Sequence, residues 1–420
     1  MPAFGESPSQ MTQSVRRRLR GAPPGLVLFF LAIALLSVGG GVWDSVYNNY
    51  LDDTFHIDAT VRGQLEFPRE LPGLLTAVMT GLFFFVADTG LGAVAAAAVA
   101  LGMGAIALVG GQWWPMVGAT LLWSIGTHLM MPVRDSVALG MAREGQQGRR
   151  LGQLGAMATL AAIGGYALVW LGERVLHWPY ATLFAAGALV AGLSVVMWLV
   201  MPRLHAHPDR PRLVIKRRYW LFYVLSFLFG ARKQIYITFG PWVLVRIFRQ
   251  RPYVFAQLQT IGALVGVFFQ PLLGRLIDRV GERFVLVGDA ALVLLVSLAY
   301  GFAAKLGRPE LGLVVACTGF VLDQVLFGVG MARTTYLAKI AERPEDLTPS
   351  LSLAVSINHL VSMSLPTLGG MVWDRFGYQW VFVGAAAVSL VNLGFAWLVR
   401  TPPSSGSAPV PEAPLEMDLD

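Results

Sequence analysis

Long apolar stretches recur along the whole chain, and short polar segments separate them. A helix that spans a bilayer needs about 20 mostly apolar residues, and a run of that length with few charges is typical of a transmembrane segment. Twelve stretches fit this description: 26–50, 67–87, 91–110, 113–138, 151–172, 179–201, 219–245, 253–274, 284–304, 311–338, 349–372 and 378–399. The pattern therefore predicts an all-α membrane protein with twelve transmembrane helices.

Composition agrees with this prediction and excludes several other classes. Of the 420 residues, 55% are hydrophobic and 14% are charged, with a mean hydropathy of +0.60. Soluble domains carry roughly 25% charged residues, and disordered, collagen-like and coiled-coil chains are excluded on similar grounds. The single cysteine, Cys317, cannot form an intrachain disulfide. Because it lies inside an apolar run, we interpret it as a buried structural thiol.

The basic residues indicate the orientation of the chain. With the N-terminus in the cytoplasm, nineteen Lys and Arg fall on the cytoplasmic side, nine fall on the other side and four lie within predicted spans. Cytoplasmic loops carry an excess of Lys and Arg, so we predict a multi-pass protein of a cell (inner) membrane with both termini cytoplasmic. Arginine outnumbers lysine 28 to 4, which favours a bacterial source. The net charge is +7, but the basic residues cluster between apolar blocks and not along one soluble face. We therefore expect no nucleic-acid partner.

The polar, basic segment 202–218 divides the predicted spans six and six. The two halves repeat some features, such as Arg134 near the end of the fourth span and Arg333 near the end of the tenth. A weak internal repeat is typical of transporters built from two bundles. We therefore predict the following organisation: a cytoplasmic N-terminal segment (1–25), a six-helix bundle (26–201), a cytoplasmic linker (202–218), a pseudo-symmetric six-helix bundle (219–399) and a disordered cytoplasmic tail (400–420).

Between the eighth and ninth spans the chain reads Gly-Arg-Leu-Ile-Asp-Arg-Val-Gly-Glu-Arg, from Gly274 to Arg283. This resembles the G-x-x-x-D-R-x-G-x-R/K signature of the major facilitator superfamily, and the twelve spans with six-plus-six symmetry resemble that family over the whole chain. The resemblance implies a secondary active transporter in which Asp278, Arg279 and Arg283 belong to a cytoplasmic gate. Ion pairs at helix ends can form in one conformer and break in the other.

Two other family signatures are incomplete. The counterpart of the loop motif in the first half keeps only Ala87-Asp88-Thr89-Gly90, without a following basic residue. The antiporter signature of the fifth span lacks its proline, although Gly164-Gly165 is present. The signatures indicate the superfamily and leave the substrate open.

Polar residues recur at three- and four-residue spacing on four spans, and such a stripe predicts a face turned to a cavity or a partner. Charges at mid-bilayer cost about 2.5–3.5 kcal/mol each, so they normally face water or a counter-charge. The superfamily resemblance places spans 1, 4, 7 and 10 around a central cavity, with span 11 beside them. We therefore predict substrate or proton contacts from Asp44, Asn48, His128, Asp323, Asn358 and His359.

Arg232 and Lys233 lie near the middle of the seventh span. Adjacent residues on a helix point about 100° apart, and we favour Lys233 as the residue that faces the cavity. Two interpretations remain open. The cations bind an anionic group of the substrate while Asp44 or Asp323 takes up a proton, or they form structural ion pairs that hold the bundles together.

The two histidines, two further charged pairs and Arg333 also have alternative interpretations. His128 and His359 either titrate near neutral pH or are hydrogen-bonded core residues. Their separation, and the lack of a histidine partner at i, i+4, argue against a metal site. Arg134, Asp135 and Arg333 near the cytoplasmic ends indicate gate pairing or snorkelling. Arg69-Glu70 indicates an outer latch or a helix start stabilised by its dipole.

The function we expect is a secondary active transporter that moves a small organic solute, with anionic solutes among the candidates, by alternating access. Proton coupling is favoured by the carboxylates and histidines of the cavity. We expect no cofactor and no enzyme activity, because the sequence shows no phosphate-binding loop and no nucleophile–base pattern. The partners we expect are the solute, protons and the bilayer, with the protein as a monomer. The alternative is a multidrug or lipid exporter of the same superfamily.

The predicted orientation can be checked with a reporter fused to the C-terminus. We expect a reporter that works only in the cytoplasm to be active and one that works only outside the cell to be silent, because both termini face the cytoplasm. The opposite result would contradict the topology.

Overall fold

A computed structural model describes residues 25–75, 88–142, 147–203, 216–343 and 346–401, and within these ranges the chain is almost entirely helical. The first half comprises α2 (Leu26–Phe55), α3 (Ala59–Gln64), α4 (Glu66–Leu74), α6 (Asp88–Val109), α7 (Trp113–Gly140), α8 (Gln147–Val169) with the π-helical turn η1 (Trp170–Val175), and α9 (Tyr180–Val200). The second half comprises η2 (Arg217–Tyr219), α10 (Trp220–Arg246), α11 (Pro252–Phe302), η3 (Ala303–Lys305), α12 (Pro309–Leu326), η4 (Phe327–Val329), α13 (Gly330–Ile340), α14 (Leu347–Phe376) and α15 (Tyr378–Trp397).

By length and composition, eight helices of the described chain could cross a membrane. One of them, α11, has 51 residues and covers two predicted spans, with a break at Gly281, where φ is 82°. The helices α12 and α13, joined by a 3₁₀ turn, together cover the predicted span 311–338. Both α10 and α14 fall outside the eight. Most of the predicted span 67–87, the N-terminal segment and nearly all of the tail lie outside the described residues.

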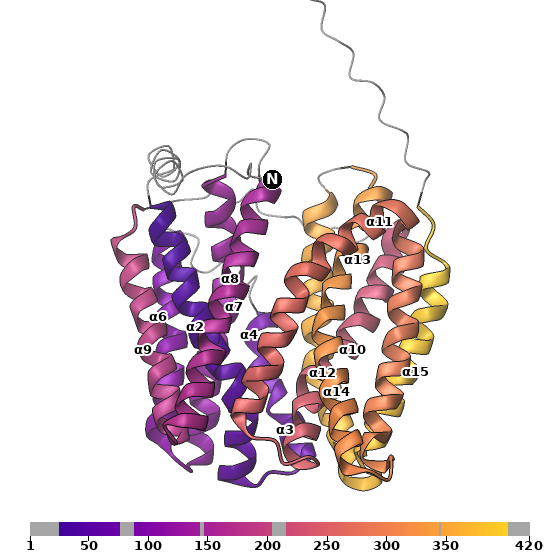
Figure 1. Cartoon of the computed structure of the whole chain (residues 1–420). Coiled ribbons are helices and arrows are strands. Elements are labelled where there is room, and N and C mark those ends of the chain that lie inside the picture. Colours follow the sequence, from indigo (N-terminus) through magenta and orange to yellow (C-terminus); the bar gives the residue numbers. More distant parts are fainter. Residues whose placement is uncertain (1–24, 76–87, 143–146, 204–215, 344–345, 402–420) are drawn as a thin grey trace, which may run out of the picture.

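The helices form two bundles that stand side by side, and the described part of the chain begins at α2 and ends after α15 on the same side of the molecule (Figure 1). We call this the terminal side. Contacts between the bundles involve α3 and α4 against α14, η1 and α8 against α11, and α2 against α10 and α11. Because α3, η1 and the start of α11 lie away from the termini (Figure 1), the bundles meet mainly on the opposite side. This makes an all-α membrane protein of two bundles, as the sequence predicts.

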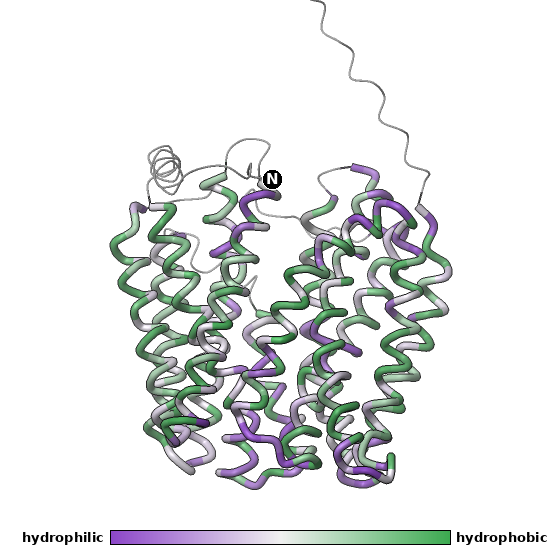
Figure 2. Tube along the Cα trace, in the orientation of Figure 1, coloured by the Kyte–Doolittle hydropathy of each residue, from purple (hydrophilic) through white to green (hydrophobic). Residues whose placement is uncertain are grey.

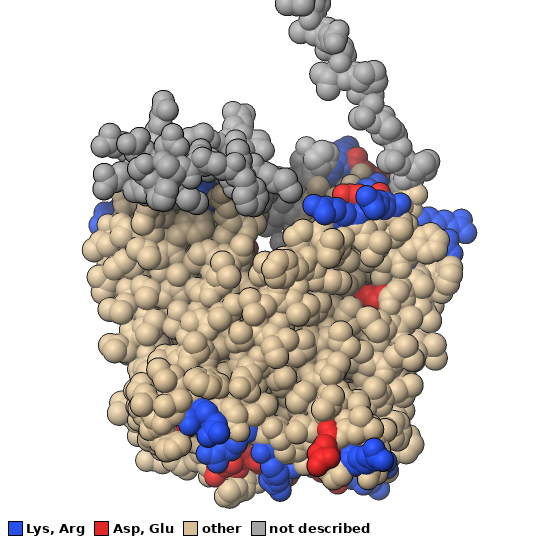
Figure 3. Space-filling model, viewed as in Figure 1, with Lys and Arg blue, Asp and Glu red and all other residues tan. Residues whose placement is uncertain are grey.

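The polar residues are distributed as a bilayer requires. On the face shown in Figure 3, Lys, Arg, Asp and Glu gather at the two ends and leave a broad belt between them that is nearly free of charge. Figure 2 shows hydrophilic segments inside this belt where α3 and α4 approach the second bundle. Polar groups in a membrane protein are normally directed at a cavity or a partner, so this region is a candidate for a functional site.

At the terminal side, the start of the second bundle is fixed by a small polar cluster. Lys216 Nζ donates to Asp346 Oδ2 at 2.6 Å and to Glu342 Oε2 at 3.0 Å, and the Tyr219 hydroxyl donates to the same Asp346 oxygen at 2.6 Å. The hydrogen bond from Lys216 lowers the pKa of Asp346 below its usual value. The linker thereby joins the start of α10 to the start of α14.

On the opposite side the chain becomes helical earlier than the span 67–87 predicts. The short helix α3 begins after Asp58, whose carboxylate accepts from the backbone N–H of Val61 at 2.7 Å as an N-cap. The backbone of α3 touches α14 directly, because a Cβ on Gly63 would lie 2.1 Å from the carbonyl oxygen of Pro366 and a Cβ on Gly370 would lie 2.3 Å from that of Ala59. Hydrophobicity alone did not reveal α3, because this segment packs on the other bundle instead of crossing the membrane by itself.

Candidate functional site

Four charged side chains of α3 and α4 form a continuous chain of ion pairs. Arg62 Nη1 bonds Glu66 Oε1 at 2.5 Å, Arg69 bonds the other oxygen of Glu66, and Arg69 Nη2 lies 2.7 Å from Glu70 Oε1. The spacing of three and four residues places Arg62, Glu66 and Arg69 along one face. Glu66 is fully buried and Arg62 is 3% exposed. Two positive and two negative charges therefore balance each other inside the protein.

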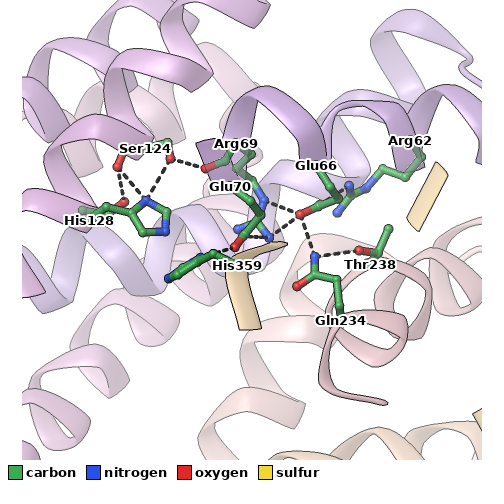
Figure 4. A network of polar contacts seen from close by, with 10 residues as sticks. Arg62, Glu66, Arg69, Glu70, Ser124, His128, Gln234, Thr238 and His359 are labelled. Atoms are coloured by element: carbon green, nitrogen blue, oxygen red, sulfur yellow. Dashed lines mark hydrogen bonds and ion pairs between the residues drawn. The ribbon is translucent and has the colours of Figure 1, made fainter. Parts of the chain in front are cut away.

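Two members of this chain also bond to the second bundle (Figure 4). The amide of Gln234 on α10 donates to Glu66 Oε2 at 2.8 Å and contacts the Thr238 hydroxyl at 3.1 Å. His359 on α14 donates from Nδ1 to Glu70 Oε2 at 2.9 Å. These hydrogen bonds must break if the two bundles separate here. We call the group Arg62, Glu66, Arg69, Glu70, Gln234 and His359 the latch.

The latch rests on α7 of the first bundle. The Ser124 hydroxyl donates to the backbone carbonyl of Arg69, and His128 donates from Nδ1 to the backbone carbonyl of Ser124 at 2.9 Å. The rings of His128 and His359 lie edge to face with their centroids 5.0 Å apart. Although the two histidines are far apart in the sequence, α4 packs against both α7 and α14 and the two rings come together.

Further contacts close the same side of the molecule around the latch. Arg246 Nη1 bonds Asp52 Oδ1 at 2.5 Å, and Arg251 bonds Glu173 Oε1 at 3.0 Å. Asp374 accepts from the backbone N–H and the hydroxyl of Thr60 at 2.8 and 2.6 Å. Each of these contacts joins one bundle to the other. The sequence signal for them is weak, since an acidic residue at the end of a span is equally typical of a solvated loop.

A second polar cluster lies within the C-terminal bundle. Arg232 Nη2 lies 3.1 Å from Asp323 Oδ1, and both side chains are buried. The guanidinium of Arg333 stacks 3.4 Å above the centre of the Phe229 ring. Asp289 of α11 is also buried. It is not among the residues predicted from the sequence, although a carboxylate inside an apolar stretch indicates a polar contact within the bundle. Lys233 is half-buried, whereas its neighbour Arg232 is 5% exposed.

Between the bundles lies a cleft of about 960 Å³, lined by α2, α8, α11 and α12 with neighbouring residues. Its polar side chains are Ser37, Asp44, Thr159, Tyr166, Gln259, Gln270 and Gln324. Of the described residues that line it, Asp44 carries the one carboxylate and none is Lys or Arg. The lining runs from the middle of α2 to the terminal half of α8. Figure 3 shows a small gap between the two halves of the molecule near the terminal side.

The other predicted binding residues are divided between these regions. Asn48 accepts from Arg62 Nε at 3.0 Å and so extends the latch. Asn358 on α14 packs against α10, where a Cβ on Gly230 would lie 2.6 Å from its amide oxygen. Asp44 faces the cleft, His128 and His359 belong to the latch region, and Arg232 and Asp323 pair inside the second bundle.

The predicted cytoplasmic gate residues are not joined across the bundles. Asp278 and Arg279 are exposed on α11, and the guanidinium of Arg283 lies 4.8 Å from the ring centre of Trp397 in the same bundle. Arg134 and Asp135 pair with each other at 3.4 Å. Each ion pair described on the terminal side joins residues of one bundle. Among the described residues, the side-chain contacts that join the bundles therefore lie on the latch side, and the ion pairs of the terminal side stay within one bundle.

Comparison with known proteins agrees with this architecture. The model of the Major Facilitator Superfamily matches residues 29–348, so the chain belongs to this superfamily. No curated protein sequence matches the chain.

Three solved structures illustrate the likeness of the fold. A variant of the nucleoside transporter NupG has a TM-score of 0.75 at 15% identity, with 89% of this chain and 99% of that chain covered. A D-xylose-proton symporter has a TM-score of 0.67 at 14% identity, with 90% and 97% covered. A bacterial homologue of the human lysosomal transporter Spinster, inward-facing and unoccupied, has a TM-score of 0.68 at 14% identity, with 89% and 96% covered. At these identities the likeness shows the fold alone.

The buried position of Glu66 leads to a stability prediction. Replacing Glu66 by Ala leaves Arg62 and Arg69 without their shared partner, and breaking a buried charge network costs about 3–5 kcal/mol. We therefore expect Glu66→Ala to lower the free energy of unfolding by that amount, measured by thermal unfolding of the purified protein.

The matched control is Glu310→Ala, an exposed residue in the first turn of α12, which should cost less than about 1 kcal/mol. Equal losses in the two variants would contradict a structural role for the buried charges.

Proposed function

We propose that the protein is a secondary active transporter that moves a small polar organic solute by alternating access and couples this movement to protons. The observation that carries the proposal is the asymmetry between the two ends of the interface. Charged and polar contacts seal the bundles on the side opposite the termini, while a cleft of about 960 Å³ lies between them towards the terminal side. Rocking of two bundles around a central site is how such folds alternate.

The proposal assigns the two gates to opposite ends. With both termini in the cytoplasm, the latch and the contacts of Asp52 and Glu173 form the outer gate, closed in this conformer. In the other conformer the bundles 26–201 and 219–399 close at the cytoplasmic side, where Asp278, Arg279 and Arg283 act with Arg134, Asp135 and Arg333. The exposure of Asp278 and Arg279 supports this assignment, because a gate charge must be free to find a new partner.

The lining of the cleft supports a neutral or cationic solute. Its hydrogen-bonding groups include the amides of Gln259, Gln270 and Gln324 and the Tyr166 hydroxyl, and its one carboxylate is Asp44. A few well-placed polar groups in an otherwise small and apolar lining are typical of a ligand site. An anionic solute, the possibility raised by Arg232 and Lys233, is disfavoured because Arg232 is buried against Asp323. Nucleosides and pentoses, which are named for two of the similar structures, provide suitable first probes.

Proton coupling is assigned to the latch and to Asp44. Protonation of Glu70 removes the charge that attracts His359 and Arg69, so it weakens the contact that joins α4 to α14. When Glu70 loses this proton to the other side of the membrane, its negative charge returns and its contact with His359 and Arg69 is restored. The Asp44 carboxylate, exposed in the cleft, is the group through which a solute and a proton can compete.

One observation favours a second candidate, a multidrug or lipid exporter. Much of the cleft wall consists of glycine, alanine and valine of α8 and α11, which leaves room for an apolar chain. The two candidates differ in the ligands that they bind, so one experiment can separate them.

Ligand stabilisation of the purified protein tests the solute class. We expect a nucleoside or sugar to raise the melting temperature, because a ligand that binds only the folded state stabilises it by RT ln(1 + [L]/Kd), about 2.7 kcal/mol at 100 Kd. Asp44→Asn and Gln324→Ala should reduce the shift, whereas Gln379→Ala, outside the cleft, should not. Stabilisation by lysolipids or lipophilic cations alone would support the exporter, and stabilisation by organic anions that is lost in Lys233→Ala would restore the anionic solute.

Distances between the bundles test the latch. Spin labels on Gln112→Cys and Arg308→Cys, in a Cys317→Ser background, report on the closed side. Gln112 is an exposed loop residue between α6 and α7 of the first bundle, and Arg308 is an exposed loop residue before α12 of the second. We expect Glu70→Gln and His359→Gln to add a longer-distance population in pulsed electron paramagnetic resonance. Asp346→Asn, which disturbs only the terminal side of the second bundle, is the control, and an unchanged distribution in all three variants would contradict the latch.

A further inference from the structure

Two imidazole rings and one carboxylate converge where the bundles meet. Glu70, His128 and His359 are buried, and one ligand atom from each lies within 4.8 Å of the others. They come from α4, α7 and α14, so the group includes both bundles. We propose that these three residues bind a divalent transition-metal ion, with Zn²⁺ as the best fit, and that the bound ion holds the two bundles closed on the latch side.

The donor set matches the chemistry of zinc. Two imidazole nitrogens and one carboxylate oxygen, with a fourth position left for water, form a common zinc arrangement. Imidazole nitrogen favours Zn²⁺ over Mg²⁺ and Ca²⁺, which prefer oxygen ligands throughout. Bonds of about 2.0–2.1 Å place neighbouring tetrahedral ligand atoms about 3.3 Å apart. The side chains therefore need to approach by an ångström or so, within the reach of rotamer adjustment on α4.

The surroundings already fix two of the ligands. Because a carbonyl oxygen can only accept, the contact with Ser124 O places the proton of His128 on Nδ1 and leaves Nε2 with its lone pair. Arg69 binds Glu70 Oε1 at 2.7 Å, so the carboxylate is oriented with Oε2 towards His359. Metal-binding histidines usually donate their second nitrogen to a carbonyl or carboxylate in this way. This orientation of His128 is an observation independent of the clustering itself.

The backbone of α4 provides the space that the rings occupy. A Cβ on Gly73 would lie 2.4 Å from the ring of His359 and 2.7 Å from the ring of His128. Such distances are far inside van der Waals contact, so both rings can lie here only because position 73 has no side chain. Gly73 offers a way to displace the two proposed ligands without removing either of them.

The local charges limit the affinity without excluding the ion. Arg69 and Lys233 act on Glu70 and oppose a cation, while Glu66 binds Arg69 and so takes up part of its charge. Glu66 is occupied by its arginine partners, and imidazole rings bind a metal as neutral ligands. Glu70 is therefore the charged ligand of the proposed ion. Glu70 and His128 belong to one bundle and His359 to the other. The bond between the ion and His359 therefore opposes separation of the bundles. The locking effect rests on the proposed function, whereas metal binding does not.

Cobalt binding to the purified, chelator-treated protein tests the site directly. We expect one Co²⁺ per chain with the visible absorption of a four-coordinate site, and displacement of that ion by Zn²⁺. His128→Gln, His359→Gln and Glu70→Gln should each weaken binding by about 100-fold or more, since loss of even an outer-shell partner costs 10–100-fold. His56→Asn is the matched control, because His56 is exposed at the end of α2 with φ 51°, which asparagine tolerates.

Gly73→Ala provides a second variant that keeps all three ligands and should also weaken binding. Absence of Co²⁺ binding in the wild-type protein, or equal binding by the wild type and His359→Gln when both are folded by circular dichroism, would overturn the site. With the spin-label pair at positions 112 and 308, saturating Zn²⁺ should remove any longer-distance population from the wild type and not from His359→Gln. A longer-distance population that persists in the wild type with bound metal would overturn the lock, and failure of solute binding in the earlier screen would leave both results intact.

Discussion

The constraint on which the rest of the structure depends is the burial of four charges on α3 and α4. Arg62, Glu66, Arg69 and Glu70 lie at a depth where an unpaired charge is costly, so they must satisfy one another and borrow partners from α10 and α14. Because those partners belong to the second bundle, satisfying the charges also closes one side of the molecule.

The close approach of α3 and α14 adds a second, steric requirement. Gly63 and Gly370 allow backbone against backbone contact, and Asp374 then caps the start of α3 by accepting from Thr60. Polar and steric contacts therefore coincide at the same end of the interface. At the terminal end the described ion pairs stay within a bundle, and the cleft that contains Asp44 lies between the helices. A single structure thus combines a sealed end and an accessible end, which alternating access requires of one conformer.

The latch and the pair of Arg232 and Asp323 differ in kind. The pair of Arg232 and Asp323 lies inside one bundle, between α10 and α12, so it can be kept when the bundles move. The latch crosses the interface, so the proposed cycle must break and remake it. This difference explains why the charges of the seventh span, which attract attention in the sequence, contribute less to the proposed cycle than Glu66 and Glu70.

The sequence by itself determined the class of protein, because the length and apolar character of a transmembrane helix are local properties that are written in consecutive residues. It also indicated the family through the motif around Asp278 and identified Asp44, His128 and His359 as polar residues of helix faces. Only the tertiary structure decided which of these residues meet. His128 and His359 are 231 positions apart and yet lie ring to ring, and Glu66, Gln234 and Gly73 gain their roles from contacts between helices. Spacing along one helix predicts a face, but the neighbour of that face depends on the packing of distant segments.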